Sequence, residues 1–279
     1  MKTLSSAHVH TQFCDGKSTA AEMAATAYAK GFVSLGFSSH ATMTYQVSGM
    51  YEDGYSMPLD KVPLYREEIR RLQKEYEGRM TIYLGIERDF YCALDPKEYD
   101  YHLAAVHQMP LNDHCFPAVD GSPAEVKKYV DEGCGGDGLL YAKRYYGMLA
   151  DFVCKEKPPI IAHVDLIRKS NPHLHLWDEE GKAYQSIALE ALTAMRESDA
   201  ILEVNTGAIG RGTLPTPYPS PFLLKRWKEL SGEIMLNSDC HNAKMLDVAY
   251  EESEELMRSV GFDHAVRLGK DTLWEQYKL

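Results

Sequence analysis

Short apolar runs alternate with longer, more polar stretches along the whole chain. Runs of this length that are bounded by turns are typical of buried strands. Several of them end beside a polar residue that is able to do chemistry. The pattern predicts seven strands, at Leu4–His10, Phe32–Phe37, Met80–Ile86, Leu103–Val106, Ile160–Ala162, Ala200–Val204 and Ile234–Leu236.

The stretches between these runs favour helices. Thr19 and Glu22 have the spacing of a capping box, and Gly31 suits the end of that helix. Six further helices are predicted, at Leu64–Glu77, Ser122–Glu132, Leu139–Lys157, Tyr184–Glu197, Pro221–Leu230 and Glu251–Val260. Alternating strands and helices favour a parallel sheet, and seven such units suit a barrel like the (β/α)8 form with one unit fewer.

The chain shows no sign of a domain boundary. No linker, repeat or low-complexity tract interrupts it, so residues 1–279 are expected to form a single domain. Two segments, Ala41–Lys61 and Lys97–Pro123, are long, aromatic and polar. We interpret them as active-site loops.

Side chains that can bind metals recur at or just after the ends of the predicted strands. In parallel β/α barrels these carboxyl ends form one face, where active sites lie. The recurring residues are His8, His10, His40, Glu87, His107, His163, Asp239 and His241, and Asn205 ends the sixth run. The remaining histidines are interpreted as packing or loop residues: His102, His114, His173, His175 and His264.

Two pairs of these residues, near the two ends of the chain, have the spacing i, i+2. They are His8 with His10 and Asp239 with His241, and Asp15 follows His10 by five positions. Residues at i and i+2 of a strand point to the same face. We therefore expect the two ends of the chain to meet around a metal centre.

Composition limits the possible settings and partners. A hydrophobic content of 44% and a charged content of 25% are ordinary for a soluble globular protein. No run of about 18 apolar residues predicts a membrane span, and no apolar signal core follows Met1. Six scattered cysteines without a CxxC pair favour reduced thiols and a cytoplasmic location. The net charge of −11 disfavours a nucleic-acid partner, but it leaves a small anionic substrate possible.

The motifs, taken together and in order, resemble the polymerase and histidinol phosphatase (PHP) superfamily of metal-dependent phosphoesterases. The resemblance covers nearly the whole chain through His8-x-His10 with Asp15, His40, Gly85-Ile86-Glu87, Val106-His107, Ala162-His163-Val164-Asp165 and Ser238-Asp239-x-His241. One departure is Ser39, where the superfamily often has Asp. A narrower similarity to the histidinol-phosphate phosphatases rests on segments 119–123, 135–137, 163–168, 203–207 and 219–224.

This resemblance implies an α/β fold, a single distorted (β/α)7 TIM-like barrel, with three divalent metal ions. Zinc, iron and manganese all suit imidazole and carboxylate ligands. The first ion would be bound by His8, His10, Glu87 and Asp239; the second would share Glu87 and add His107 and His163; the third would be bound by Asp15, His40 and His241.

The implied reaction is hydrolysis of L-histidinol phosphate to L-histidinol and phosphate, a step of histidine biosynthesis. Hydroxide that bridges two metals would attack phosphorus, with Glu87 and Asp239 as catalytic ligands. Asp165 shares the face of His163 and would orient a ligand or protonate the leaving alkoxide. The expected substrate-binding residues are Arg168, Arg211 and Asn205, the two arginines as bidentate donors to phosphate.

Two alternatives stay open at this point. A related enzyme would act on another small phosphomonoester or on a nucleotide, which the loops would decide. A non-enzymatic metal-binding module would be expected to have lost some ligands, whereas every expected ligand position is filled here. Metal identity and oligomeric state are not determined by these patterns.

Overall fold

The computed structural model describes residues 4–279. Residues 1–3, at the start of the N-terminal segment in which no signal core was expected, lie outside the described residues. The strands form one sheet whose spatial order follows the chain. The first eight strands pair in parallel with one another, and the ninth is antiparallel to the eighth. The strands are β1 (Leu4–Ser6), β2 (Phe32–Phe37), β3 (Thr81–Asp89), β4 (Tyr101–Ala105), β5 (Ile160–Ile161), β6 (Ile201–Asn205), β7 (Ile234–Asn237), β8 (His264–Leu268) and β9 (Trp274–Lys278).

The prediction of an α/β fold with a mainly parallel sheet is confirmed. Each predicted run overlaps a strand, and β3 continues to Asp89, so Glu87 lies inside it. The structure adds two strands to the seven predicted ones, since β8 and β9 form a C-terminal hairpin. Most residues of β9 are polar, and each of its side chains is at least partly exposed, so it has no apolar run to recognise.

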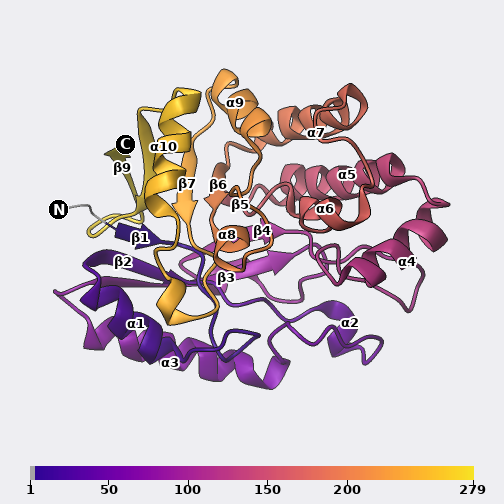
Figure 1. Ribbon diagram of the computed structural model, residues 1–279. Helices are drawn as coiled ribbons and strands as arrows, with labels where there is room; N and C mark the ends of the chain where they lie inside the picture. The colour runs from indigo at the N-terminus through magenta and orange to yellow at the C-terminus, as the bar shows by residue number, and fades with distance from the viewer. Residues whose placement is uncertain (1–3) are drawn as a thin grey trace.

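The helices lie outside the sheet (Figure 1). All seven predicted helices are present, and the capping box at Thr19 and Glu22 is formed. Short helices α2, α6 and α8 occur in loops. The helices are α1 (Ala20–Ala29), α2 (Thr44–Val47), α3 (Val62–Glu75), α4 (Pro123–Cys134), α5 (Gly138–Glu156), α6 (Asn171–Leu174), α7 (Lys182–Met195), α8 (Gly207–Gly210), α9 (Pro221–Glu229) and α10 (Tyr250–Val260).

The two ends of the chain meet. In Figure 1 the indigo strand β1 lies beside the yellow C-terminal elements, and β1 contacts both β7 and β8. Just beyond these strands, Val9 and Cys240 form a parallel bridge, and His10 donates its backbone N–H to the carbonyl of Cys240 at 2.9 Å. The expected meeting of the termini is therefore present in the backbone.

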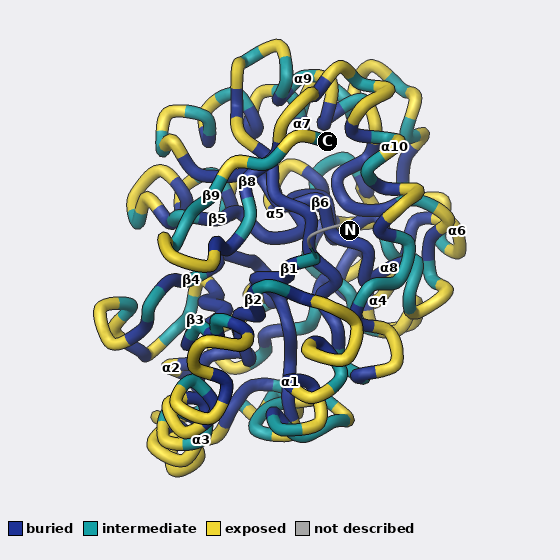
Figure 2. Tube along the Cα trace, turned by 90° about the vertical axis from the view of Figure 1, so that its left-hand side faces the viewer, coloured by how far each residue is buried: buried dark blue, intermediate teal, exposed yellow. Residues whose placement is uncertain are grey.

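Burial is concentrated in the strands and in the segments that follow them (Figure 2). Two large apolar clusters pack helices against the sheet, one built around α5 and α7 and the other around α1 and α3. Buried polar residues gather instead after the carboxyl ends of the strands, among them His8, His10 and His163. No helix within residues 4–279 combines the length and apolar character needed to cross a membrane.

Candidate metal centre

Four side-chain atoms from three parts of the chain converge on one point. Nε2 of His8 lies 3.3 Å from Oε2 of Glu87 and 3.6 Å from Oδ1 of Asp239. Nε2 of His10 lies 3.5 Å and 3.2 Å from the same two oxygens. These four residues are the set expected for the first ion.

The backbone after β1 explains why both histidines reach this point. Val9, between them, is fully buried in an apolar cluster and bridges to Cys240. His8 and His10 therefore share the opposite side, as the i, i+2 spacing predicts. Asp239 has a positive φ of 48°, a conformation that Asp tolerates better than most residues, so this part of the chain departs from a regular strand.

The spacing of these atoms suits a bound cation. Zinc binds nitrogen and oxygen ligands in a tetrahedron at roughly 2.0–2.2 Å, which separates the ligand atoms by about 3.3–3.6 Å. The four distances above run from 3.2 to 3.6 Å. Nε2 of His8, Nε2 of His10 and Oε2 of Glu87 are also buried without a hydrogen-bond partner. Buried polar atoms are normally satisfied, so the residues present fit a metal ion.

Glu87 connects this group to a second one. Its other oxygen, Oε1, lies 2.9 Å from Nε2 of His163 and 3.6 Å from Nε2 of His107. His107 follows β4 and His163 follows β5, the next strands along the sheet from β3. A carboxylate with ligand atoms gathered at both of its oxygens has the geometry of a bridge between two cations.

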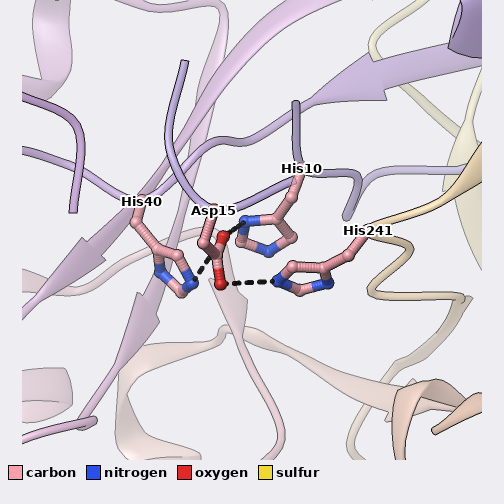
Figure 3. Close-up of side chains that lie close together, drawn as sticks. All are labelled: His10, Asp15, His40 and His241. Atoms are coloured by element: carbon pink, nitrogen blue, oxygen red, sulfur yellow. Dashed lines mark ion pairs between the residues drawn. The ribbon is translucent and has the colours of Figure 1, made fainter. Parts of the chain in front are cut away.

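A third group surrounds Asp15 (Figure 3). Its Oδ2 lies 3.2 Å from Nε2 of His241, and its Oδ1 lies 3.8 Å from Nε2 of His40. Nδ1 of His10 also comes within 3.7 Å of Oδ1. The structure thus brings together the expected third set and adds His10, whose two ring nitrogens face different groups.

The cluster carries buried negative charge. Burial opposes ionisation of Glu87, but His8 and His40 outweigh it and hold the pKa of this carboxyl well below its usual range. Burial acts in the same way on Asp239, and Arg211 and His8 lower its pKa. For His40, burial favours the neutral ring, yet the Glu87 carboxylate raises its pKa to about 10. The Glu87 carboxylate thus favours a positive charge beside it, which is the behaviour expected of a cation site. His10 differs, because burial and the neighbouring His241 and His40 lower its pKa to about 3.

The sequence of this chain matches the PHP domain over residues 6–207, which is most of its length. The chain belongs to the PHP domain family. The matched region contains the last residue of β1 and all of β2 to β6, and, among the clustered residues, lacks only Asp239 and His241.

Similar proteins cover nearly all of this PHP chain. A probable histidinol-phosphatase of Deinococcus radiodurans is 28% identical over 94% of this chain and 95% of its own length. The histidinol-phosphatase of Bacillus subtilis is 24% identical over 88% of this chain and 96% of its own length. A crystal structure of histidinol phosphate phosphatase from Lactococcus lactis, in complex with zinc, L-histidinol and phosphate, has a TM-score of 0.66 at 22% identity, covering 94% of this chain and 95% of that chain. The last comparison supports the fold.

Glu203 is a buried residue of this PHP site for which the sequence predicted no role, although it belongs to segment 203–207 of the family resemblance. Its Oε1 accepts hydrogen bonds from Nδ1 of His8 (2.7 Å) and Nδ2 of Asn237 (3.0 Å). Its Oε2 accepts from Nδ2 of Asn205 (2.9 Å) and the backbone N–H of His163 (2.8 Å). A carboxylate on the far nitrogen of a ligand histidine sets its tautomer and orientation. Asp89 contacts His107 in the same manner, with Oδ2 3.2 Å from Nδ1.

The two predicted phosphate-binding arginines lie in different surroundings. Arg211 lines the cavity above the cluster, and its Nη2 donates to Oδ2 of Asp239 at 3.0 Å. Gly207 makes room for this pair, since a Cβ there would lie 2.7 Å from Nη2 of Arg211 and 2.8 Å from Oδ2 of Asp239. Arg168 instead pairs with Asp165 (3.2 Å) and Glu179 (3.0 Å) and is not among the lining residues.

Asn205 and Asp165 also lie outside the cavity lining. The amide of Asn205 is used internally, with Nδ2 donating to Glu203 and Oδ1 accepting from Gly207 at 2.8 Å. Oδ2 of Asp165 accepts from the backbone N–H of Ser220 at 2.8 Å, and burial raises the pKa of Asp165. Both side chains therefore make hydrogen bonds to other protein groups. Their roles toward the substrate stay predictions.

The cavity has a volume of about 570 Å³ and opens over all three groups. Both predicted active-site loops reach it, one through Tyr55 and the other through His107 and Asp120. The ring of Tyr55 meets that of His40 edge-on, with centroids 4.6 Å apart. Asp120 and Leu166 also line the cavity, from segments 119–123 and 163–168 of the family resemblance. Lining residues that the sequence patterns did not single out are Lys17, Lys169, Asn242, Met245 and Val248.

Proposed function

We propose that this protein is a metal-dependent phosphomonoesterase that hydrolyses L-histidinol phosphate to L-histidinol and phosphate. The observation that carries the proposal is the position of Glu87, whose two oxygens join two groups of imidazole and carboxylate atoms. His107, His163 and Asp239 of these groups line the cavity. Paired cation sites of this kind stabilise both the attacking and the leaving oxygen in phosphoester hydrolysis. Relatives named histidinol-phosphatase align over 88–94% of this chain, which supports this substrate.

Three divalent ions are proposed for the three groups. His8, His10, Glu87 and Asp239 would bind the first; Glu87, His107 and His163 the second; and Asp15, His40 and His241 the third. Zinc, iron and manganese fit this donor chemistry. When bound, such ions lower the pKa of water and polarise phosphoryl oxygens.

The chain's own residues would orient the ester. Arg211 presents a guanidinium to the cavity from a position fixed by Asp239 and would donate to phosphate oxygens. Asp165 and Arg168 form a buried ion pair outside the cavity lining. Asp165 would orient a ligand or protonate the leaving alkoxide, and Arg168 would donate to the phosphate. Asn205 would act through Glu203, by holding the carboxylate that orients His8.

The finer description of the fold is also a proposal. Contacts of β1 with β7 and β8 support a distorted (β/α)7 TIM-like barrel that forms a single domain over residues 1–279. A cytoplasmic location and the lack of a nucleic-acid partner stay predictions.

The proposal is tested by phosphate release from a panel of phosphomonoesters. Purified protein loaded with zinc or manganese would be assayed on L-histidinol phosphate, other amino-alcohol phosphates, sugar phosphates and nucleotides. We expect kcat/KM for L-histidinol phosphate to exceed that of every other ester by at least about tenfold, equivalent to roughly 1.4 kcal/mol of transition-state binding. Equal, slow rates across the panel would reject this substrate, and tightly bound metal without any activity would favour a non-enzymatic module.

Replacing Glu203 by glutamine is expected to weaken zinc binding by about 10–100-fold, the usual effect of losing a carboxylate behind a ligand histidine. The amide would direct donor hydrogens at His8 or at the backbone N–H of His163, both of which donate to the native carboxylate. Zinc affinity measured by competition with a chelator checks this. Glu190→Gln, on the exposed surface of α7, is the control; equal affinities of the two variants would contradict the role of Glu203.

A further inference from the structure

Asp120 brings a carboxylate into the cavity wall outside the three metal groups. It lies in the loop between β4 and α4, where Val119 donates its backbone N–H to the carbonyl of His107 at 2.7 Å. An antiparallel β-bridge between Gln108 and Ala118 also folds this segment back on itself. Asp120 is therefore held beside a residue of the metal cluster by main-chain hydrogen bonds.

Lys169 fixes one side of this carboxylate. Its Nζ donates to Oδ2 of Asp120 at 2.8 Å and to the Asp120 carbonyl at 2.7 Å. Among the described residues, no hydrogen bond uses Oδ1, and the Asp120 side chain stays 27% exposed. Burial raises the pKa of Asp120, but the Lys169 ammonium outweighs it and lowers the pKa below its usual value. The cavity thus contains an ionised carboxylate with one oxygen free to accept.

A free acceptor at this place has no role toward phosphate. Phosphate oxygens are themselves acceptors, and an ionised carboxylate repels them unless a cation lies between. The other wall cations, Arg211 and Lys17, are the groups suited to phosphate. A substrate that carries its own positive charge would remove the conflict by placing that charge on Oδ1.

We propose that Asp120 is a specificity-determining residue that selects phosphomonoesters whose alcohol carries an ammonium group, by accepting an ionic hydrogen bond at Oδ1. This rests on the proposed function and names the part of the substrate that the wall recognises. Lys169 is then a positioning residue, since it holds Oδ2 and the main chain of Asp120 and leaves Oδ1 of this cavity-lining residue without a hydrogen bond to the described residues.

The test compares L-histidinol phosphate with 3-(imidazol-4-yl)propyl phosphate, which lacks only the amino group, in the metal-loaded wild type and in Asp120→Asn. Hydrogen bonds to charged groups contribute about 1.5–3 kcal/mol, so we expect KM for L-histidinol phosphate to rise about 10–100-fold in the variant with kcat nearly unchanged. The deamino ester should give the same KM in both proteins. Asp113→Asn, an exposed change of the same charge in the same loop, should leave both esters unaffected.

Three results would overturn the proposal. One is an equal rise in KM for both esters in Asp120→Asn, and another is no rise for either. The third needs no variant: equal KM values of the two esters in the wild type would mean that the amino group is not recognised. If the wild type hydrolyses other amino-alcohol phosphates but not L-histidinol phosphate, the proposed function fails. The role of Asp120 is then tested by the same KM comparison, with phosphoethanolamine and ethyl phosphate as the two esters.

Discussion

Glu87→Gln is expected to lower kcat on L-histidinol phosphate by at least about 10³-fold and to reduce the bound metal. Both oxygens of Glu87 are occupied by ligand groups, Oε2 toward His8 and His10 and Oε1 toward His163. A neutral amide offers one acceptor oxygen and an NH2 group that only donates, so it cannot bridge two cations. Losing about 4 kcal/mol of metal-assisted stabilisation corresponds to this factor. The check is steady-state kinetics with metal content measured by mass spectrometry on the same samples.

Glu156→Gln provides the matched control for that experiment. Glu156 pairs with Arg88 at 3.3 Å and does not line the cavity, so its amide variant should keep wild-type turnover and metal content. Turnover of Glu87→Gln within about tenfold of the wild type, at full metal content, would show that the carboxylate does not bridge.

Asp239→Asn is expected to abolish measurable turnover. Its Oδ1 contacts Nε2 of both His8 and His10, while its Oδ2 accepts from Arg211, so one substitution weakens the first metal group and releases the guanidinium. We expect kcat/KM to fall by about 10³-fold or more, since a ligand and a charge-assisted hydrogen bond are lost together. Phosphate release over a range of substrate concentrations measures the loss.

The control for Asp239→Asn is Asp247→Asn, a nearby carboxylate whose partner is Lys30 at 2.8 Å on the surface. It should retain wild-type activity. Near-normal turnover of Asp239→Asn would contradict the ligand assignment, whereas a fall in both variants would point to damage in this loop.

The strand ends could be predicted from sequence because the topology fixes where they lie. In a parallel sheet every carboxyl end emerges on one side, so a histidine or carboxylate after each apolar run is brought to a common place whatever the loops do. His8, Glu87 and His163 come from separate strands and meet within hydrogen-bonding or ion-pair distance. The i, i+2 spacing of His8 and His10 also predicts that both side chains lie on the same side of the chain.

The outer contacts could not be predicted in this way. In the sequence, Glu203 is a polar residue inside an otherwise apolar strand, and only the fold shows that it faces His8 and not solvent. Arg168 and Arg211 both follow strands in sequence, yet one pairs with Asp165 behind the wall and the other lines the cavity. These differences depend on loop conformation and long side-chain rotamers, which periodicity does not encode.

The central claim is that metal ions in this cluster are required for hydrolysis of L-histidinol phosphate. Its most direct test follows phosphate release from that ester by the purified protein before chelation, after removal of metal, and after addition of zinc, iron(II) or manganese. We predict that removal abolishes activity and that at least one of these ions restores it, with three ions bound per chain. Full activity of metal-free protein would contradict the claim.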